Sequence, residues 1–166
     1  MPDNRPGDHG PSPFPTLTDD DGVPPGVVIL RTSDEPSIVL IRIMVGWVFL
    51  WAGLMKFLSP ATYGAGAFDA WGIPFPDLMG PLVGAFEIGC ALLVLFGVGV
   101  RVSVLPLMVI IFFALVRVQI PAIGSEGLLF AIQEAHLDVA MLLATLFLLR
   151  VGAGPRSVDA RIAANP

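Results

Sequence analysis

Four long apolar stretches dominate the pattern of hydrophobic and polar positions in this chain. Shorter segments rich in glycine, proline or charged residues separate them. The stretches run from about Ile38 to Leu58, Leu78 to Val98, Val102 to Val118 and Ala131 to Leu149. Each is close to the roughly 20 residues that an α-helix needs to cross the hydrocarbon core of a bilayer. The pattern therefore predicts an all-α integral membrane protein, a bundle of four spanning helices.

The connections between these stretches differ in length. Ser59–Asp77 and Gln119–Gln133 are the longer ones, and the first holds aromatic residues that suit a membrane interface. The turn Gly97-Val98-Gly99 is tight. Pro106 falls in the first turns of the third stretch, where a helix can accommodate it or bend.

Charge divides the 166-residue chain into three parts. Residues 1–36 hold seven acidic and two basic side chains and eight prolines, so we expect a disordered acidic tail. Residues 37–152 form the predicted four-helix domain, and residues 153–166 a polar C-terminal tail. Because residues 37–166 carry seven charges of each sign, the net charge of −5 belongs to the first tail. The balanced body and the acidic tail argue against nucleic acid as a partner.

The positions of the basic residues predict the orientation in the membrane. With both termini in the cytoplasm, five basic residues face that side and only Lys56 and Arg117 face outward. The five are Arg31, Arg101, Arg150, Arg156 and Arg161. The longer connections would then lie outside.

Few residues could hold a redox cofactor or a metal. Cys90 is the only cysteine, which excludes an intramolecular disulfide, a Cys-x-x-Cys pair and an iron–sulfur ligand set. The two histidines are His9 in the tail and His136, so bis-histidine haem ligation within one chain is disfavoured. Any redox cofactor would therefore come from a partner or a diffusible ligand, and no metal site is expected.

Ionisable residues inside the apolar stretches are the candidate functional positions, because a charge at the bilayer centre costs roughly 2.5–3.5 kcal/mol on insertion scales. One helical face of the first stretch carries two cations, and one face of the second carries a carboxylate. The first face comprises Arg42, Gly46, Phe49, Gly53 and Lys56, and the second Gly80, Gly84, Glu87 and Ala91.

Glycines on both faces permit close helix approach, so the two faces should meet and Glu87 should compensate a cation. The sequence does not decide between Arg42 and Lys56. It also leaves three interpretations open for Glu87: an ion pair that fixes helix register, a proton or quinone site, or a harmless position at the membrane interface.

The fourth stretch carries His136 and Asp138 close to its start. One interpretation places them at a solvated helix end. The other brings Lys56, Glu87, Arg117 and Asp138 together in the outer half of the bundle, as a polar pocket for an anionic or quinone-like ligand. A His–Asp pair two residues apart does not share a helix face and is not a metal motif.

Several ordered motifs resemble the DoxX family of small bacterial membrane proteins. They are Arg42-Ile43-Met44-Val45-Gly46 with Ala52-Gly53 and Lys56-Phe57, then Trp71-Gly72-Ile73-Pro74-Phe75-Pro76, then Glu87-Ile88-Gly89 with Gly97 and Arg101, and finally Gly152 to Asp159. The resemblance covers about Ile38 to Asp159. It implies a four-helix bundle in the bacterial inner membrane and a link to redox biology, since related subunits belong to thiosulfate:quinone oxidoreductases. It assigns no catalytic role to Glu87 or Arg42.

These observations favour an accessory or quinone-interacting subunit of a membrane redox system. It would have no intrinsic cofactor, with quinone as the candidate ligand. Its expected partners are the bilayer, a soluble oxidoreductase or another membrane subunit, and a further copy of itself. The alternatives are a permease that uses Glu87 with Arg42 or Lys56, and a non-catalytic scaffold. Whether the chain is an enzyme is left open.

Overall fold

The computed structural model describes residues 35–125 and 127–164, and within them it has four helices long and apolar enough to cross a membrane. These are α2 (Ile38–Leu58), α5 (Pro76–Phe96), α6 (Val100–Ala114) with its π-helical continuation η1 (Leu115–Gln119), and α8 (Leu128–Val151). The predicted all-α four-helix membrane fold is confirmed. Residues 1–34 of the expected acidic tail lie outside the described residues.

The predicted helix boundaries agree with the observed ones to within three residues. The first stretch matches α2 at both ends, whereas α5, α6 and α8 each begin two or three residues earlier than expected. The early start of α5 has a local cause. Pro76 occupies its first position, where a missing N–H costs nothing, and Asp77 adds a carboxylate to its first turn.

The longer connections contain short helices. The connection after α2 folds into α3 (Pro60–Tyr63) and α4 (Ala65–Ala70), and the connection after η1 begins with α7 (Ile120–Ser125). A further helix, α9 (Val158–Ala164), lies in the predicted C-terminal tail. Residues 153–164 therefore pack against the bundle, although the sequence places the end of the four-helix domain at residue 152.

The tight turn between α5 and α6 depends on two glycines. Gly97 and Gly99 have φ of 72° and 53°, in the left-handed region that glycine adopts without steric cost. Val98 N–H donates to the Leu93 carbonyl at 2.9 Å and Gly97 N–H to the Val94 carbonyl at 3.2 Å, which is a Schellman cap. This cap ends α5 and reverses the chain into α6.

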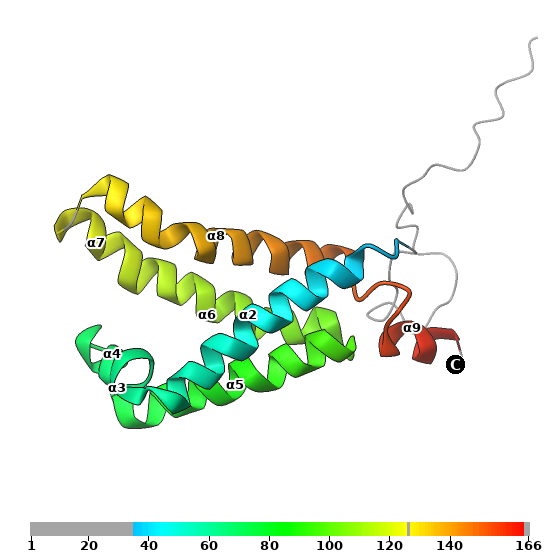
Figure 1. Cartoon of the computed structure of the whole chain (residues 1–166), viewed down its shortest axis with the longest axis horizontal. Coiled ribbons are helices and arrows are strands. Elements are labelled where there is room, and N and C mark those ends of the chain that lie inside the picture. The colour runs from blue at the N-terminus through cyan, green and yellow to red at the C-terminus, as the bar shows by residue number, and fades with distance from the viewer. Residues whose placement is uncertain (1–34, 126, 165–166) are drawn as a thin grey trace, which may run out of the picture.

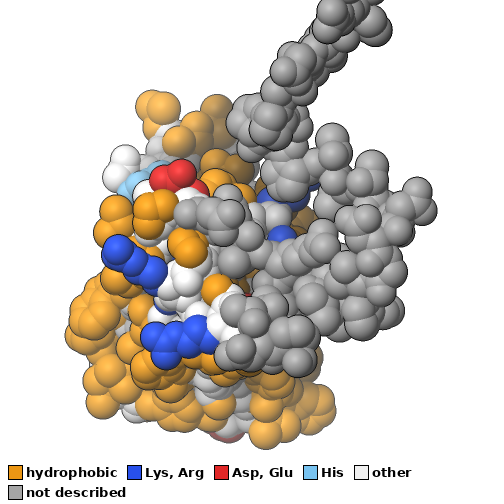
Figure 2. All heavy atoms as spheres, turned by 90° about the vertical axis from the view of Figure 1, so that its right-hand side faces the viewer, with side chains coloured by type: hydrophobic (Ala, Val, Ile, Leu, Met, Phe, Trp, Pro, Cys, Tyr) orange, Lys and Arg blue, Asp and Glu red, His pale blue; other side chains and the backbone are white. Residues whose placement is uncertain are grey.

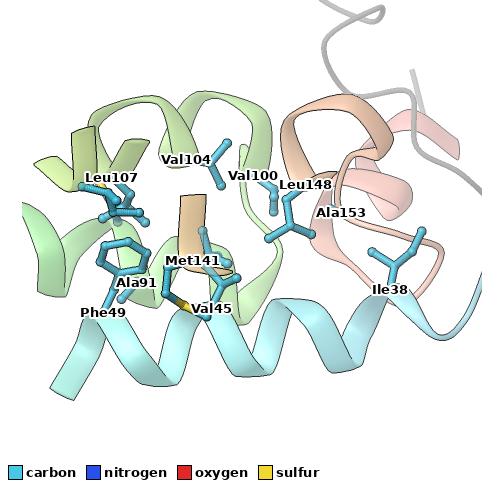
Figure 3. Packing of buried hydrophobic residues seen from close by; sticks show 13 residues of the cluster. Ile38, Val45, Phe49, Ala91, Val100, Val104, Leu107, Met141, Leu148 and Ala153 are labelled. Carbon is cyan, nitrogen blue, oxygen red and sulfur yellow. The ribbon is translucent and has the colours of Figure 1, made fainter. Parts of the chain in front are cut away.

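The helices form two antiparallel pairs, α2 with α5 and α6 with α8 (Figure 1). The pairs come together at the α9 end and diverge towards α3, α4 and α7. A buried apolar cluster joins them at the α9 end, with Val45, Val104, Leu107 and Leu148 among its members (Figure 3). The cytoplasmic location of both termini stays a prediction.

Glycines allow α2 and α5 to pack closely. A Cβ atom on Gly53 would lie 2.8 Å from the Gly84 carbonyl oxygen, and one on Gly46 2.4 Å from Leu95 Cγ. The predicted meeting of the two small-residue faces is thus observed around Gly53 and Gly84. Gly80 differs, because its α-carbon faces the start of α4, where a Cβ would lie 2.7 Å from the Ala65 nitrogen. Membrane helices gain little hydrophobic energy from pairing, so such close packing holds them together.

We expect Gly53→Ala to destabilise the protein by about 1–3 kcal/mol, because the added methyl group would meet α5 backbone that cannot rotate away. Gly89→Ala on the open face of α5 is the matched control, since a Cβ there has no neighbour within 4 Å. Thermal unfolding in detergent measures both. Equal melting temperatures for the two variants would show that the α2–α5 contact is looser than described.

Candidate functional site

Glu87 is paired with Lys56 between α2 and α5. The Lys56 Nζ atom donates to Glu87 Oε2 at 2.6 Å, and the two side chains are 14% and 4% exposed, respectively. Glu87 lies near the middle of α5, where hydrocarbon would surround it on a lone helix. Its partner, which the sequence left undecided, is therefore Lys56.

The direction of side chains along an antiparallel helix pair explains this choice. Every Cα–Cβ bond in an α-helix tilts towards the N-terminus of its own helix. Lys56 and Glu87 each lie three residues beyond the Gly53–Gly84 contact, on opposite sides of it in depth. Each therefore leans back towards the contact, and the two charged groups meet beside it.

Arg42 makes its contacts at the other end of α2. It lies beside Leu95, whose carbonyl oxygen accepts from Arg42 Nη2 at 3.1 Å. Leu95 is eight residues beyond Glu87, which corresponds to about 12 Å along the helix axis. Arg42 also leans towards the start of α2, away from Glu87. The two cations of this face thus serve different sites.

The Arg42 guanidinium binds the segment that follows α8. Arg42 Nη1 donates to the Ala153 carbonyl at 2.6 Å and to the Arg156 carbonyl at 3.3 Å. Arg42 is buried, and its Nε has no hydrogen-bond partner among the described residues. One cation therefore connects the start of α2, the end of α5 and the C-terminal segment.

Asp159 secures the same segment from the other side. Its two carboxylate oxygens accept from the Gly99 and Val100 amides at 2.6 and 3.1 Å, which caps the first turn of α6. The Asp159 amide donates to the Gly97 carbonyl at 3.0 Å. A Cβ on Gly97 would lie 2.6 Å from Ser157 Cβ, so glycine is needed for this close approach as well. We call this assembly of Arg42, Asp159 and residues 153–164 the C-terminal clasp.

The other candidate residues lie apart from the Lys56–Glu87 pair. Arg117 in η1 is exposed and donates to the Trp71 carbonyl at 3.2 Å, so it tethers the α4–α5 connection. His136 is exposed and its Nδ1 contacts the carbonyl of Gln133 in the preceding turn. Asp138 is half-buried and has a polar interaction of its own. The contacts described for these three do not join them to Glu87.

An apolar groove of about 350 Å³ lies between α6, η1, α7 and α8. It includes none of the six candidate polar residues. Phe112, Ile120 and Leu128 are among its lining side chains, all of them hydrophobic. This groove therefore differs in chemistry from the polar pocket that the sequence suggested.

Comparison with known proteins agrees with this structure. The DoxX family model matches residues 37–120, about half of the chain. The chain belongs to the DoxX family. It is also 37% identical over 140 residues to an uncharacterized membrane protein of Mycobacterium tuberculosis, and the match covers 81% of this chain and 86% of the relative. No solved structure matches the chain.

The structure has two polar centres, the Lys56–Glu87 pair and the C-terminal clasp, and the family match covers only the first in full. Arg42, Lys56 and Glu87 all fall within residues 37–120, whereas Asp159 and the rest of the C-terminal segment follow them. Sequence reasoning singled out the first three and overlooked Asp159, because an acidic residue in a short polar tail gives no sign of burial. Two signals were available: the C-terminal motif Gly152 to Asp159, and the Gly97-Val98-Gly99 turn, whose free amides need an acceptor.

We expect Arg42→Met to release the C-terminal segment, because it leaves the Leu95, Ala153 and Arg156 carbonyls without their donor, at about 1–3 kcal/mol for each unsatisfied buried group. Trypsin, which cleaves after arginine, should then cut after Arg156 faster than in the unaltered protein. Arg117→Met is the control, since Arg117 is exposed and lies in η1. Unchanged cleavage at Arg156 in the Arg42→Met protein would contradict the clasp.

Proposed function

We propose that this DoxX-family membrane protein is a quinone-interacting accessory subunit of a redox system in the bacterial inner membrane. One observation carries the proposal: a Lys–Glu ion pair held inside the span by two closely packed helices, with Lys56 14% exposed. Intramembrane ionisable residues are costly and commonly mark ligand or proton pathways.

The chemistry of Lys56 suits a quinone carbonyl. Its ammonium group has three N–H donors, and the described ion pair with Glu87 Oε2 uses one of them. The Lys56 side chain is 14% exposed, so the pair is not fully enclosed. A carbonyl oxygen on a lipid-soluble ring could accept from Lys56 there, while Glu87 keeps the ammonium charged and oriented.

The composition of the chain supports an accessory role. With one cysteine and two histidines, it offers few of the ligands that hold iron–sulfur clusters or haem. Electron transfer would then involve a partner, either a soluble oxidoreductase or another membrane subunit. The permease alternative would use the same Lys56–Glu87 pair as its charged site.

The test must separate binding from folding, because the same pair also stabilises the helix contact. Removing one partner leaves a buried uncompensated charge, so Glu87→Leu should cost about 3–5 kcal/mol. The double replacement Lys56→Met with Glu87→Leu removes both charges at similar volume and should restore stability to that of the unaltered protein or above it. Thermal unfolding measures this half of the prediction.

The other half of the prediction concerns quinone binding. A short-chain ubiquinone analogue, titrated into the protein in nanodiscs, should bind the unaltered protein and lose at least about tenfold in affinity in the stable double variant, the equivalent of losing one charge-assisted hydrogen bond. Arg117→Gln, whose described hydrogen bond goes to Trp71 and not to the pair, should bind normally. If the double variant is stable and binds the analogue as well as the unaltered protein does, the pair is a structural element and the scaffold alternative holds.

A further inference from the structure

The end of the bundle that carries α9 is basic. Arg101 lies in the first turn of α6, Arg150 in the last turn of α8, Arg156 in the connection that follows, and Arg161 in α9. Arg101 is half-buried and the other three are exposed. Arg101 Nη2 donates to the Arg150 carbonyl at 3.2 Å, which shows that these two helix ends are neighbours. Figure 2 looks onto this end and shows basic side chains at its surface.

Little described negative charge opposes the three exposed arginines, Arg150, Arg156 and Arg161. Asp159 is buried, and both of its carboxylate oxygens accept backbone amides at the start of α6. Glu35 is exposed and accepts from the Ser37 hydroxyl at 3.0 Å. Three exposed arginines therefore outnumber one exposed carboxylate, Glu35, at this end of the described chain.

Helix α9 adds exposed apolar side chains beside this charge. Val158 and Ile162, one turn apart, are 36% and 50% exposed, and Arg161 lies on the same side of the helix. Asp159, on the buried side, fixes α9 to the turn between α5 and α6. The open side of α9 thus carries one cation and two apolar side chains, a combination that suits a position at a membrane surface.

The arginines at this end lie at the depth of the lipid headgroups. Arg101 and Arg150 lie in the end turns of spanning helices, at the level where hydrocarbon gives way to lipid headgroups. We propose that this end of the protein is a binding surface for anionic phospholipid headgroups. The lipid phosphates contact Arg150, Arg156 and Arg161, and the side chains of Val158 and Ile162 enter the adjoining acyl boundary. The C-terminal clasp holds α9 in place for this contact.

Lipid retention tests the proposal. The full chain is reconstituted in nanodiscs of equimolar phosphatidylglycerol and phosphatidylcholine, and the lipids it keeps on release are counted by native mass spectrometry. We expect enrichment of phosphatidylglycerol that weakens with added salt. Because a basic residue near an anionic surface contributes about fivefold, the Arg150→Gln, Arg156→Gln, Arg161→Gln triple variant should lose most of the enrichment. The three single variants should each lose part of it.

Three controls make the result decisive. Arg117→Gln lies in η1, away from this surface, and should retain the enrichment. Val158→Gln with Ile162→Gln leaves the charge unchanged and should lower retention; if it does not, the role assigned to these apolar side chains is wrong. Asp19→Asn, Asp20→Asn and Asp21→Asn together neutralise part of the N-terminal tail.

Two results would overturn the proposal outright. The first is equal enrichment in the unaltered protein and in the triple arginine variant, with both folded by thermal unfolding. The second is enrichment that appears only when the three aspartates are neutralised, because the arginines would then be covered by the chain's own acidic tail rather than by lipid.

Discussion

The close antiparallel contact between α2 and α5 is the constraint on which both polar centres depend. Glycine at positions 53 and 84 lets the two backbones approach, with only 2.8 Å between a Cβ built on Gly53 and the Gly84 carbonyl oxygen. That contact sets the register of the pair. Once the register is set, the tilt of helical side chains brings Lys56 to Glu87 and Arg42 to the end of α5. A shift of one helical turn would separate both sets of partners.

The two centres satisfy their charges in different ways. Arg42 donates to three backbone carbonyls, and Asp159 accepts from two backbone amides, so each charge is bound by dipoles fixed in the fold. The Lys56 ammonium has Glu87 as its described partner, and it remains partly exposed. A ligand site inside a membrane requires a donor that a ligand can reach, and Lys56 is 14% exposed whereas Arg42 is 4% exposed. This difference is why the proposed function rests on the Lys56–Glu87 pair.

The sequence predicted the fold because the bilayer imposes one length and one polarity on every spanning helix. It also predicted the facing stripes, since Arg42, Gly53, Gly84 and Glu87 repeat at helical spacing. It could not place residues 153–164, because their burial depends on hydrogen bonds to atoms more than fifty residues away along the chain, such as Gly99 N–H. Nor did it identify Lys56 as the partner of Glu87 at first, although the side-chain tilt in an antiparallel pair contains that answer. The pocket that one interpretation built from Lys56, Glu87, Arg117 and Asp138 stays a prediction; the described hydrogen bond of Arg117 goes to the Trp71 carbonyl.

The cost of burying charge explains how a pair such as Lys56–Glu87 can persist in a membrane protein. Two apolar residues of similar volume would hold α2 and α5 together at least as well, because each charge pays for desolvation before the pair gains from attraction. Loss of either residue alone, however, strands the other charge in hydrocarbon. Replacing the two charged residues one at a time therefore passes through a strongly destabilised protein. The instability of that single variant can preserve the pair even where no ligand binds. Ligand binding must therefore be measured in the variant in which both residues are apolar. Because that variant lacks the stranded charge, a loss of binding in it identifies a ligand site, and unchanged binding identifies a structural pair.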